Sequence, residues 1–181
     1  MTLPNALRLA FVAAPLLLGA CETLKSIDFN PKPELPPPCP RAVVGENAGR
    51  LTRFNGAGKE PANIVFEAEI GDLAGSCVYN GDTINVDLQI QLIAGRGPAA
   101  TDDNAKFNYF VAVARTDKTV LSRDGFDTVI DLPGNQTRNQ TVEELEQTIP
   151  LAKGDTGANL VIVVGIEMTP DELEFNRKQG R

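Results

Sequence analysis

The sequence predicts an all-β protein: an antiparallel β-sandwich followed by a short C-terminal helix. The clearest signal is residues 83–94, where Ile84, Val86 and Leu88 begin an apolar series that alternates with polar residues. A period of two is typical of a strand with one buried face. From residue 41 onward, apolar stretches of strand length recur with turn residues between them, and no long segment has a helical period. Seven or eight such strands without alternating helices favour a sandwich or barrel.

The strands before this central one are short or half-buried. Residues 63–70 alternate apolar and acidic side chains, and an Asn80-Gly81-Asp82 sequence precedes the central strand. An Asn-Gly pair between extended runs is typical of a hairpin turn, because both residues tolerate positive φ. The expected strands in this half are 42–44, 50–54, 63–70 and 77–80.

The second half contains strands that are apolar on both faces. Residues 107–115 are expected in the middle of a sheet, and in 158–168 Val161 and Val163 face away from Leu160, Ile162 and Val164. Residues 96–106 and 133–140 read as polar loops, with further strands at 119–123 and 125–132. Residues 141–151 fit either a strand or a short helix opened by Thr141 and Glu144, and we expect a strand. A capped start at Thr169-Pro170 predicts the C-terminal helix. We expect immunoglobulin-like or fibronectin-like packing.

The N-terminus reads as an export signal. Arg8 precedes the apolar run 9–18, which is too short to span a bilayer comfortably. The run ends in Leu18-Gly19-Ala20-Cys21, which resembles the lipobox of bacterial lipoproteins. The resemblance implies cleavage before Cys21, lipidation of its sulfur and acylation of its amine. Glu22 follows where Asp would imply retention in the inner membrane, so the resemblance implies outer-membrane sorting. The alternatives for Cys21 are a plain signal-peptidase site or an uncleaved anchor.

Residues 21–40 read as a lipidated, proline-rich tether between the signal peptide, 1–20, and the domain, 41–168, with 169–181 as the C-terminal helix and tail. Of the chain's 13 prolines, 6 fall between Pro31 and Pro40. Proline favours an extended arm, and such a segment is alternatively a ligand for aromatic grooves. Cys39 and Cys77 are the pair that remains in an exported domain, and we expect them to form a disulfide. The alternatives are a redox thiol or a metal ligand.

The composition argues against nucleic-acid binding, metal binding and catalysis that needs a histidine. The chain holds 17 Lys and Arg against 24 Asp and Glu, no His and no Trp. An acidic chain is a poor partner for nucleic acid, and the missing His removes the usual general base and metal ligand. Asp155-Thr156-Gly157-Ala158 resembles the catalytic sequence of retroviral-type aspartic proteases, yet Lys153-Gly154 replaces the apolar strand before it, so we expect a turn. The acidic turns at 80–82 and 102–104 lack the spacing of a calcium loop.

The sequence therefore predicts a non-enzymatic outer-membrane lipoprotein, without cofactor or metal, that faces the periplasm. It would present its sandwich to an envelope protein assembly as an accessory or scaffold subunit. Loops 96–106 and 133–140 are the expected binding surface, because loops on a rigid scaffold carry function; a strand edge is the other route. The glutamates 67, 69, 143, 144 and 146 could form an acidic face. The alternative function is binding of a small solute, lipid or glycan in the periplasm.

Overall fold

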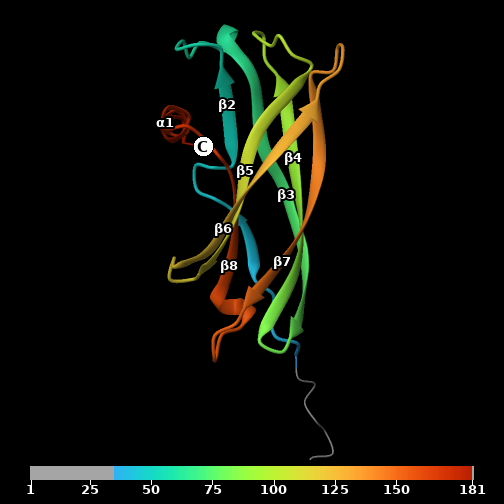
Figure 1. Ribbon diagram of the computed structural model, residues 1–181. Coiled ribbons are helices and arrows are strands. Elements are labelled where there is room, and N and C mark those ends of the chain that lie inside the picture. The colour runs from blue at the N-terminus through green and yellow to red at the C-terminus, as the bar shows by residue number, and fades with distance from the viewer. Residues whose placement is uncertain (1–34, 181) are drawn as a thin grey trace, which may run out of the picture. The chain divides into compact units, whose positions relative to one another are not determined.

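The structure, a computed structural model, describes residues 35–180. Two four-stranded sheets face each other, which confirms the predicted all-β sandwich (Figure 1). The first sheet has the order β1-β8-β5-β6 and the second β2-β3-β4-β7. The strands are β1 Arg41–Val44, β2 Arg50–Phe54, β3 Ile64–Asn80, β4 Thr83–Arg96, β5 Asn104–Arg115, β6 Val120–Asp131, β7 Arg138–Pro150 and β8 Leu160–Ile166. Two short 3-10 turns, η1 (Pro61–Asn63) and η2 (Gly157–Asn159), precede β3 and β8.

Part of the connectivity is that of an immunoglobulin sandwich. β4 pairs with β7 in one sheet and β5 pairs with β8 in the other, as strands B with E and C with F do in immunoglobulin domains. The edge differs, because β1 lies beside β8 and runs parallel to it. An immunoglobulin domain has its last, antiparallel strand at this position.

The core lies between the sheets, and β4 supplies its centre. The inward side chains of β4 are between 0% and 3% exposed from Ile84 to Leu92. This confirms the face predicted from the alternation. β5 is paired on both sides, with β6 and β8, as expected for a strand that is apolar on both faces.

β1 and β2 are successive parts of one edge that changes sheets. Gly45 N–H still donates to Val164 O of the first sheet at 2.8 Å, whereas Ile70 N–H of β3 donates to Gly49 O at 2.9 Å. β2 then pairs with β3 only between Ile64 and Glu69. The second half of β3 is therefore left as an edge.

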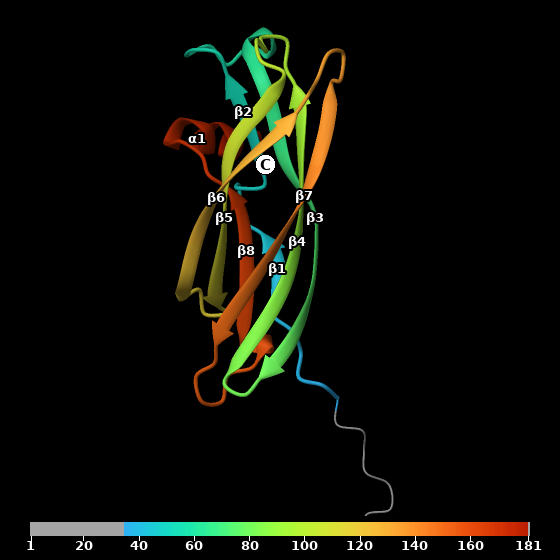
Figure 2. The same ribbon diagram turned by 45° about the vertical axis from the view of Figure 1, so that its right-hand side comes forward.

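Helix α1 (Pro170–Gln179) lies beside β2 (Figure 2). Its predicted cap is present, with Thr169 and Glu172 forming a capping box. Arg53 Nε lies 2.8 Å from Glu172 Oε1, and the Phe54 and Phe175 rings meet edge to face at 5.1 Å. The Asn176 side chain, 1% exposed, donates to Arg50 O at 2.6 Å. These contacts fasten the helix to the sandwich edge.

Several predicted boundaries are wrong. Strands 63–70 and 77–80 are one strand, β3, because an irregularity between Ile70 and Leu73 interrupts the alternation without ending the pairing. Strands 119–123 and 125–132 are likewise one strand, β6. The predicted hairpin, by contrast, is confirmed: β3 ends at Asn80, β4 begins at Thr83, and Gly81 in the turn has φ 63°. The two polar loops are shorter than predicted, since β5 begins at Asn104 and β7 at Arg138. Residues 141–151 are strand up to Pro150, which confirms the preferred alternative.

Candidate functional site

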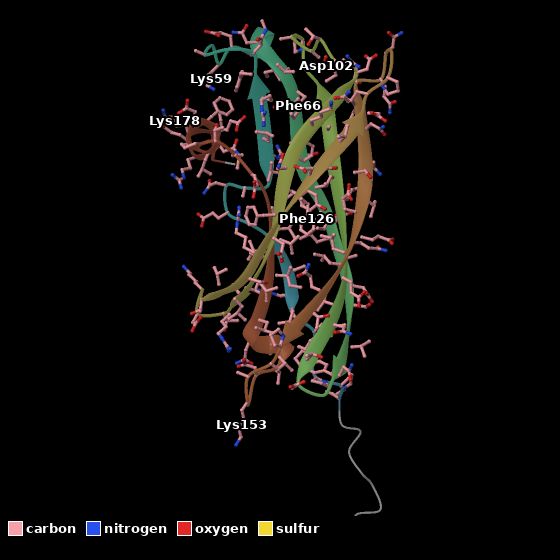
Figure 3. The ribbon with its side chains drawn as sticks, in the orientation of Figure 1. Lys59, Phe66, Asp102, Phe126, Lys153 and Lys178 are labelled. Carbon is pink, nitrogen blue, oxygen red and sulfur yellow. A yellow bond between two sulfur atoms is a disulfide. The ribbon has the colours of Figure 1, made fainter. Side chains whose placement is uncertain are left out.

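The strand directions give the sandwich two ends. β3 runs from Ile64 to Asn80 and β4 returns from Thr83 to Arg96. We call the end that holds loops 55–63, 97–103 and 132–137 the loop end, and the end that holds segment 38–40, the β3–β4 hairpin and residues 151–159 the entry end. Figure 3 shows Asp102 and Lys59 at the loop end and Lys153 at the entry end.

Arg96 links the two polar loops of the loop end by hydrogen bonds. Its guanidinium donates to the carbonyl oxygen of Asp102 at 3.1 Å and to Asp103 Oδ1 at 2.8 Å, and it also donates to the carbonyl oxygen of Leu132. It thereby joins the two loops that the sequence predicts as the binding surface. A backbone bond, Leu132 N–H to Asp103 O at 2.7 Å, joins the same loops. Since the Arg96 side chain is only 20% exposed, it acts as an internal support of this surface.

Loop 97–103 is also attached to the start of β3. Gly97 N–H donates to Val65 O at 2.9 Å and Ala99 N–H to Ile64 O at 2.8 Å. A Cβ on Gly97 would lie 2.1 Å from Ile64 O, so this approach requires glycine. Hydrogen bonds thus hold loop 97–103 both to loop 132–137 and to the start of β3.

A groove of about 280 Å³ adjoins the loop end on the outer face of the second sheet. Gly95 lines it and contributes no side chain. Glu69 lies between two arginines: its Oε2 is 3.1 Å from Arg50 Nη2, and its Oε1 accepts from Arg138. The groove therefore offers paired charges, which suit polar contacts with a protein surface.

The entry end is closed by a covalent bond. Cys39 and Cys77 form a disulfide with a Cα–Cα distance of 5.7 Å, which confirms the predicted pair. It attaches Cys39, two residues before the start of β1, to the second half of β3. The segment that leads into the domain is thereby joined to both sheets.

Tyr79 and Gly157 close the same end without covalent bonds. The Tyr79 hydroxyl donates to Pro38 O at 2.7 Å and accepts from Gly157 N–H at 2.7 Å. A Cβ on Gly157 would lie 2.1 Å from Pro38 O. The Pro38–Cys39–Pro40 backbone therefore packs directly against the η2 turn. Neither contact is apparent from the sequence, because the partners are far apart in the chain and a single Tyr or Gly carries no spacing signal.

The other candidate residues of the sequence do not form a common site among the described residues. Cys21 lies outside the described residues. Asp155 is in a turn, as expected, and its Oδ2 pairs with Arg115 Nη1 at 2.6 Å. Asp103 is the ion-pair partner of Arg96. Within residues 35–180, no group of three or more acidic, Cys or His residues is placed to hold a metal ion.

The five glutamates do not form one acidic face. Glu144 and Glu146 lie on the outer face beside Gln89 and Asp87, whereas Glu143 lies opposite Ile90 and turns inward. Its Oε1 accepts from the Thr128 hydroxyl at 3.1 Å. Burial, and secondly the Glu143 charge, raise the pKa of the Tyr109 phenol to about 12. Alternation along β7 therefore divides the acidic run between two faces.

Comparisons with known proteins add little. No protein-family model and no curated protein sequence matches this chain. One solved structure is similar over 69% of this chain and 79% of its own, the variable (V) domain of the Streptococcus agalactiae AgI/II polypeptide BspA, with 10% identity and a TM-score of 0.20. That score is too low to indicate a common fold or function. No helix among the described residues has the length and apolar character needed to cross a bilayer.

Proposed function

We propose that this chain is an outer-membrane lipoprotein that has no enzymatic activity and presents a periplasmic β-sandwich to an envelope protein assembly. The observation that carries the proposal is the Leu18-Gly19-Ala20-Cys21 sequence directly after an apolar run. Several acyl chains on Cys21 would hold the protein at a membrane for practical purposes permanently.

The two ends of the sandwich support separate roles in this proposal, attachment to the tether at one end and partner binding at the other. The entry end receives the tether and is closed by the Cys39–Cys77 disulfide. The loop end lies at the other end of β3 and β4, and Arg96 holds its two polar loops together. The chain therefore enters the domain at the end that does not hold these loops. We therefore assign partner binding to loops 97–103 and 132–137.

Lipidation is tested by metabolic labelling with a palmitate analogue. We expect label on the wild-type chain and none on Cys21→Ala. The matched control is Cys39→Ala/Cys77→Ala, which removes the other cysteines and should keep the label. Label on Cys21→Ala, or an unlabelled wild type, would contradict the anchor.

Partner binding is tested by purifying the tagged full chain from the native envelope in mild detergent. Proteins present in stoichiometric amount are expected with the wild type and lost with Arg96→Ala. Arg115→Ala is the matched control, because Arg115 forms a similar half-buried ion pair at the entry end. Loss with both variants would indicate general destabilisation and contradict a role for the loop end.

The alternative function is a carrier of a small solute, lipid or glycan. The interior positions that such a ligand would need hold Ile84, Ile90 and Ile162, each at most 1% exposed. A ligand would have to lie in a surface groove. A purified chain without protein partners that carries a small molecule in native mass spectrometry would favour this alternative.

A further inference from the structure

The second half of β3 is an unpaired strand edge. β2 pairs with β3 no further than Glu69, and among residues 35–180 no other strand pairs with this side of β3. On the opposite side, β4 pairs with β3 as far as Asn80. Residues 38–40 lie beside this half of β3 through the Cys39–Cys77 disulfide and the Tyr79 hydroxyl, but they form no strand ladder with it. Residues 73–80 therefore have no strand partner on this side within the described structure.

Beyond Asp72, this edge carries no charge. Residues 73–80 are Leu-Ala-Gly-Ser-Cys-Val-Tyr-Asn, and Val78 is 65% exposed. Natural edges are usually protected by charged side chains or proline. The other edge strands of the described structure hold such charges: Arg41 in β1, Arg50 and Arg53 in β2, Arg123, Asp124, Asp127 and Asp131 in β6, and Arg138, Glu143, Glu144 and Glu146 in β7.

An open slot of about 190 Å³ lies beside the same edge, between β1 and β3. Gly75 lines it, and Val86, Leu88 and Ile162 from the core form part of its wall. These three side chains are at most 3% exposed, so the slot reaches the core. A strand laid along β3 would cover it and bury further apolar surface.

We propose that the β3 edge pairs with the same edge of a second copy, which gives a dimer with a continuous eight-stranded sheet. A twofold axis between identical edges makes the two β3 strands antiparallel, and such symmetric dimers are the commonest oligomers. The absence of charged side chains in residues 73–80 favours this edge for self-pairing. Pairing of residues 73–80 with themselves sets no like charges opposite each other in any register, whereas self-pairing of β7 would bring glutamates of the two copies together.

The experiment is cysteine scanning in the full chain, in its native envelope. Ala74, Ser76 and Val78 lie in turn on the outer face of β3, opposite Gln89, Asp87 and Asn85 of β4. Each is replaced by Cys. Near the twofold axis the two copies of one residue face each other at the separation that a disulfide requires. We expect a reducible band of twice the chain mass at one or two of these positions.

Val129→Cys and Val142→Cys are the matched controls. Both valines are 52% exposed, on β6 and β7. Equal crosslinking at the controls would show random collision and overturn the proposal, as would absence of any crosslink at the three β3 positions. A β3 crosslink to a protein of different mass would assign the edge to another partner and also overturn self-pairing.

A second measurement is independent of new cysteines. Ser76→Lys and Val78→Lys add a like charge to both copies, and in native mass spectrometry of the full chain they should lower the dimer-to-monomer ratio about tenfold, which equals about 1.4 kcal/mol. Val142→Lys should leave the ratio unchanged. An unchanged dimer with both β3 variants, or a wild type that is monomeric at all concentrations, would contradict the proposal.

Discussion

The two ends of the sandwich are closed by different means. At the entry end, a disulfide and the Tyr79 hydroxyl fix the backbone of residues 38–40 against β3 and η2. At the loop end, one arginine side chain and a few backbone bonds join loops 97–103 and 132–137. A covalent closure holds one geometry, whereas hydrogen bonds from a single side chain can rearrange at modest cost. This difference is consistent with the roles proposed above, attachment at the entry end and partner binding at the loop end.

The largest expected effect comes from removing the covalent closure. Cys39→Ala/Cys77→Ala opens a loop with a sequence separation of 38 residues, which should lower the free energy of unfolding by about 4 kcal/mol in the chain-entropy model. Urea unfolding measures this. Hydrogen exchange should become faster first in β1 and the second half of β3. Equal acceleration in loops 97–103 and 132–137 would contradict the separation of the two ends.

The next effect acts on the core between the ends. The Tyr109 side chain is 1% exposed, and its raised pKa of about 12 means that the folded state keeps the phenol proton longer than the unfolded chain does. The stabilisation is complete below pH of about 10 and is lost between about 10 and 12, amounting to about 3 kcal/mol. Tyr109→Phe should remove this slope from unfolding measured against pH. As the pH of the wild-type protein rises from about 10 to 12, hydrogen exchange should become faster at both ends together, in contrast to the disulfide variant.

Arg96→Ala should have a smaller effect, confined to the loop end. It leaves the carbonyl oxygens of Asp102 and Leu132 without this donor, which should cost about 1–2 kcal/mol. We expect faster hydrogen exchange in loops 97–103 and 132–137 and an unchanged entry end. Arg96→Lys keeps the charge but cannot reach several acceptors at once, so an unaffected Arg96→Lys would show that charge alone is sufficient.

The smallest effect is expected for Tyr79→Phe. The hydroxyl makes two hydrogen bonds, to Pro38 O and from Gly157 N–H, and its removal should cost about 1 kcal/mol while the disulfide keeps the segment in place. The same substitution in the Cys39→Ala/Cys77→Ala background should cost more. Equal costs in the two backgrounds, measured by a double-mutant cycle, would show that the two closures act independently.

The sandwich can be predicted from the sequence because its main strands have local patterns of apolar and polar residues. The alternation in residues 83–94 and the two-faced apolar strands at 107–115 and 158–168 give β4, β5 and β8 directly. Strand boundaries are less predictable. An irregularity such as the one between Ile70 and Leu73 resembles a strand end in sequence, because pairing with β4 is what continues the strand across it.

The candidate site is predictable only in part. The Cys39–Cys77 disulfide follows from the number and position of the cysteines, and the two loops proposed to bind a partner follow from their polar composition. The role of Arg96 does not follow, because it depends on acceptors at Asp102 and Leu132 that only the tertiary fold brings to one guanidinium. The open edge of β3 is equally hidden, since it exists only because β1 and β2 belong to different sheets.

The position of the disulfide also decides how the domain bears mechanical load. A pull on the chain ahead of Cys39 passes through the sulfur atoms to Cys77 and so into β3, and does not act on the β1–β8 pairing alone. β3 pairs with β4 from Phe66 to Asn80, so a force along the strand axis acts on this whole ladder of hydrogen bonds in shear. Without the disulfide the same pull would act first on the short β1–β8 ladder, in which only residues 41–44 are paired. The oxidised domain should therefore resist extension far better than the reduced one.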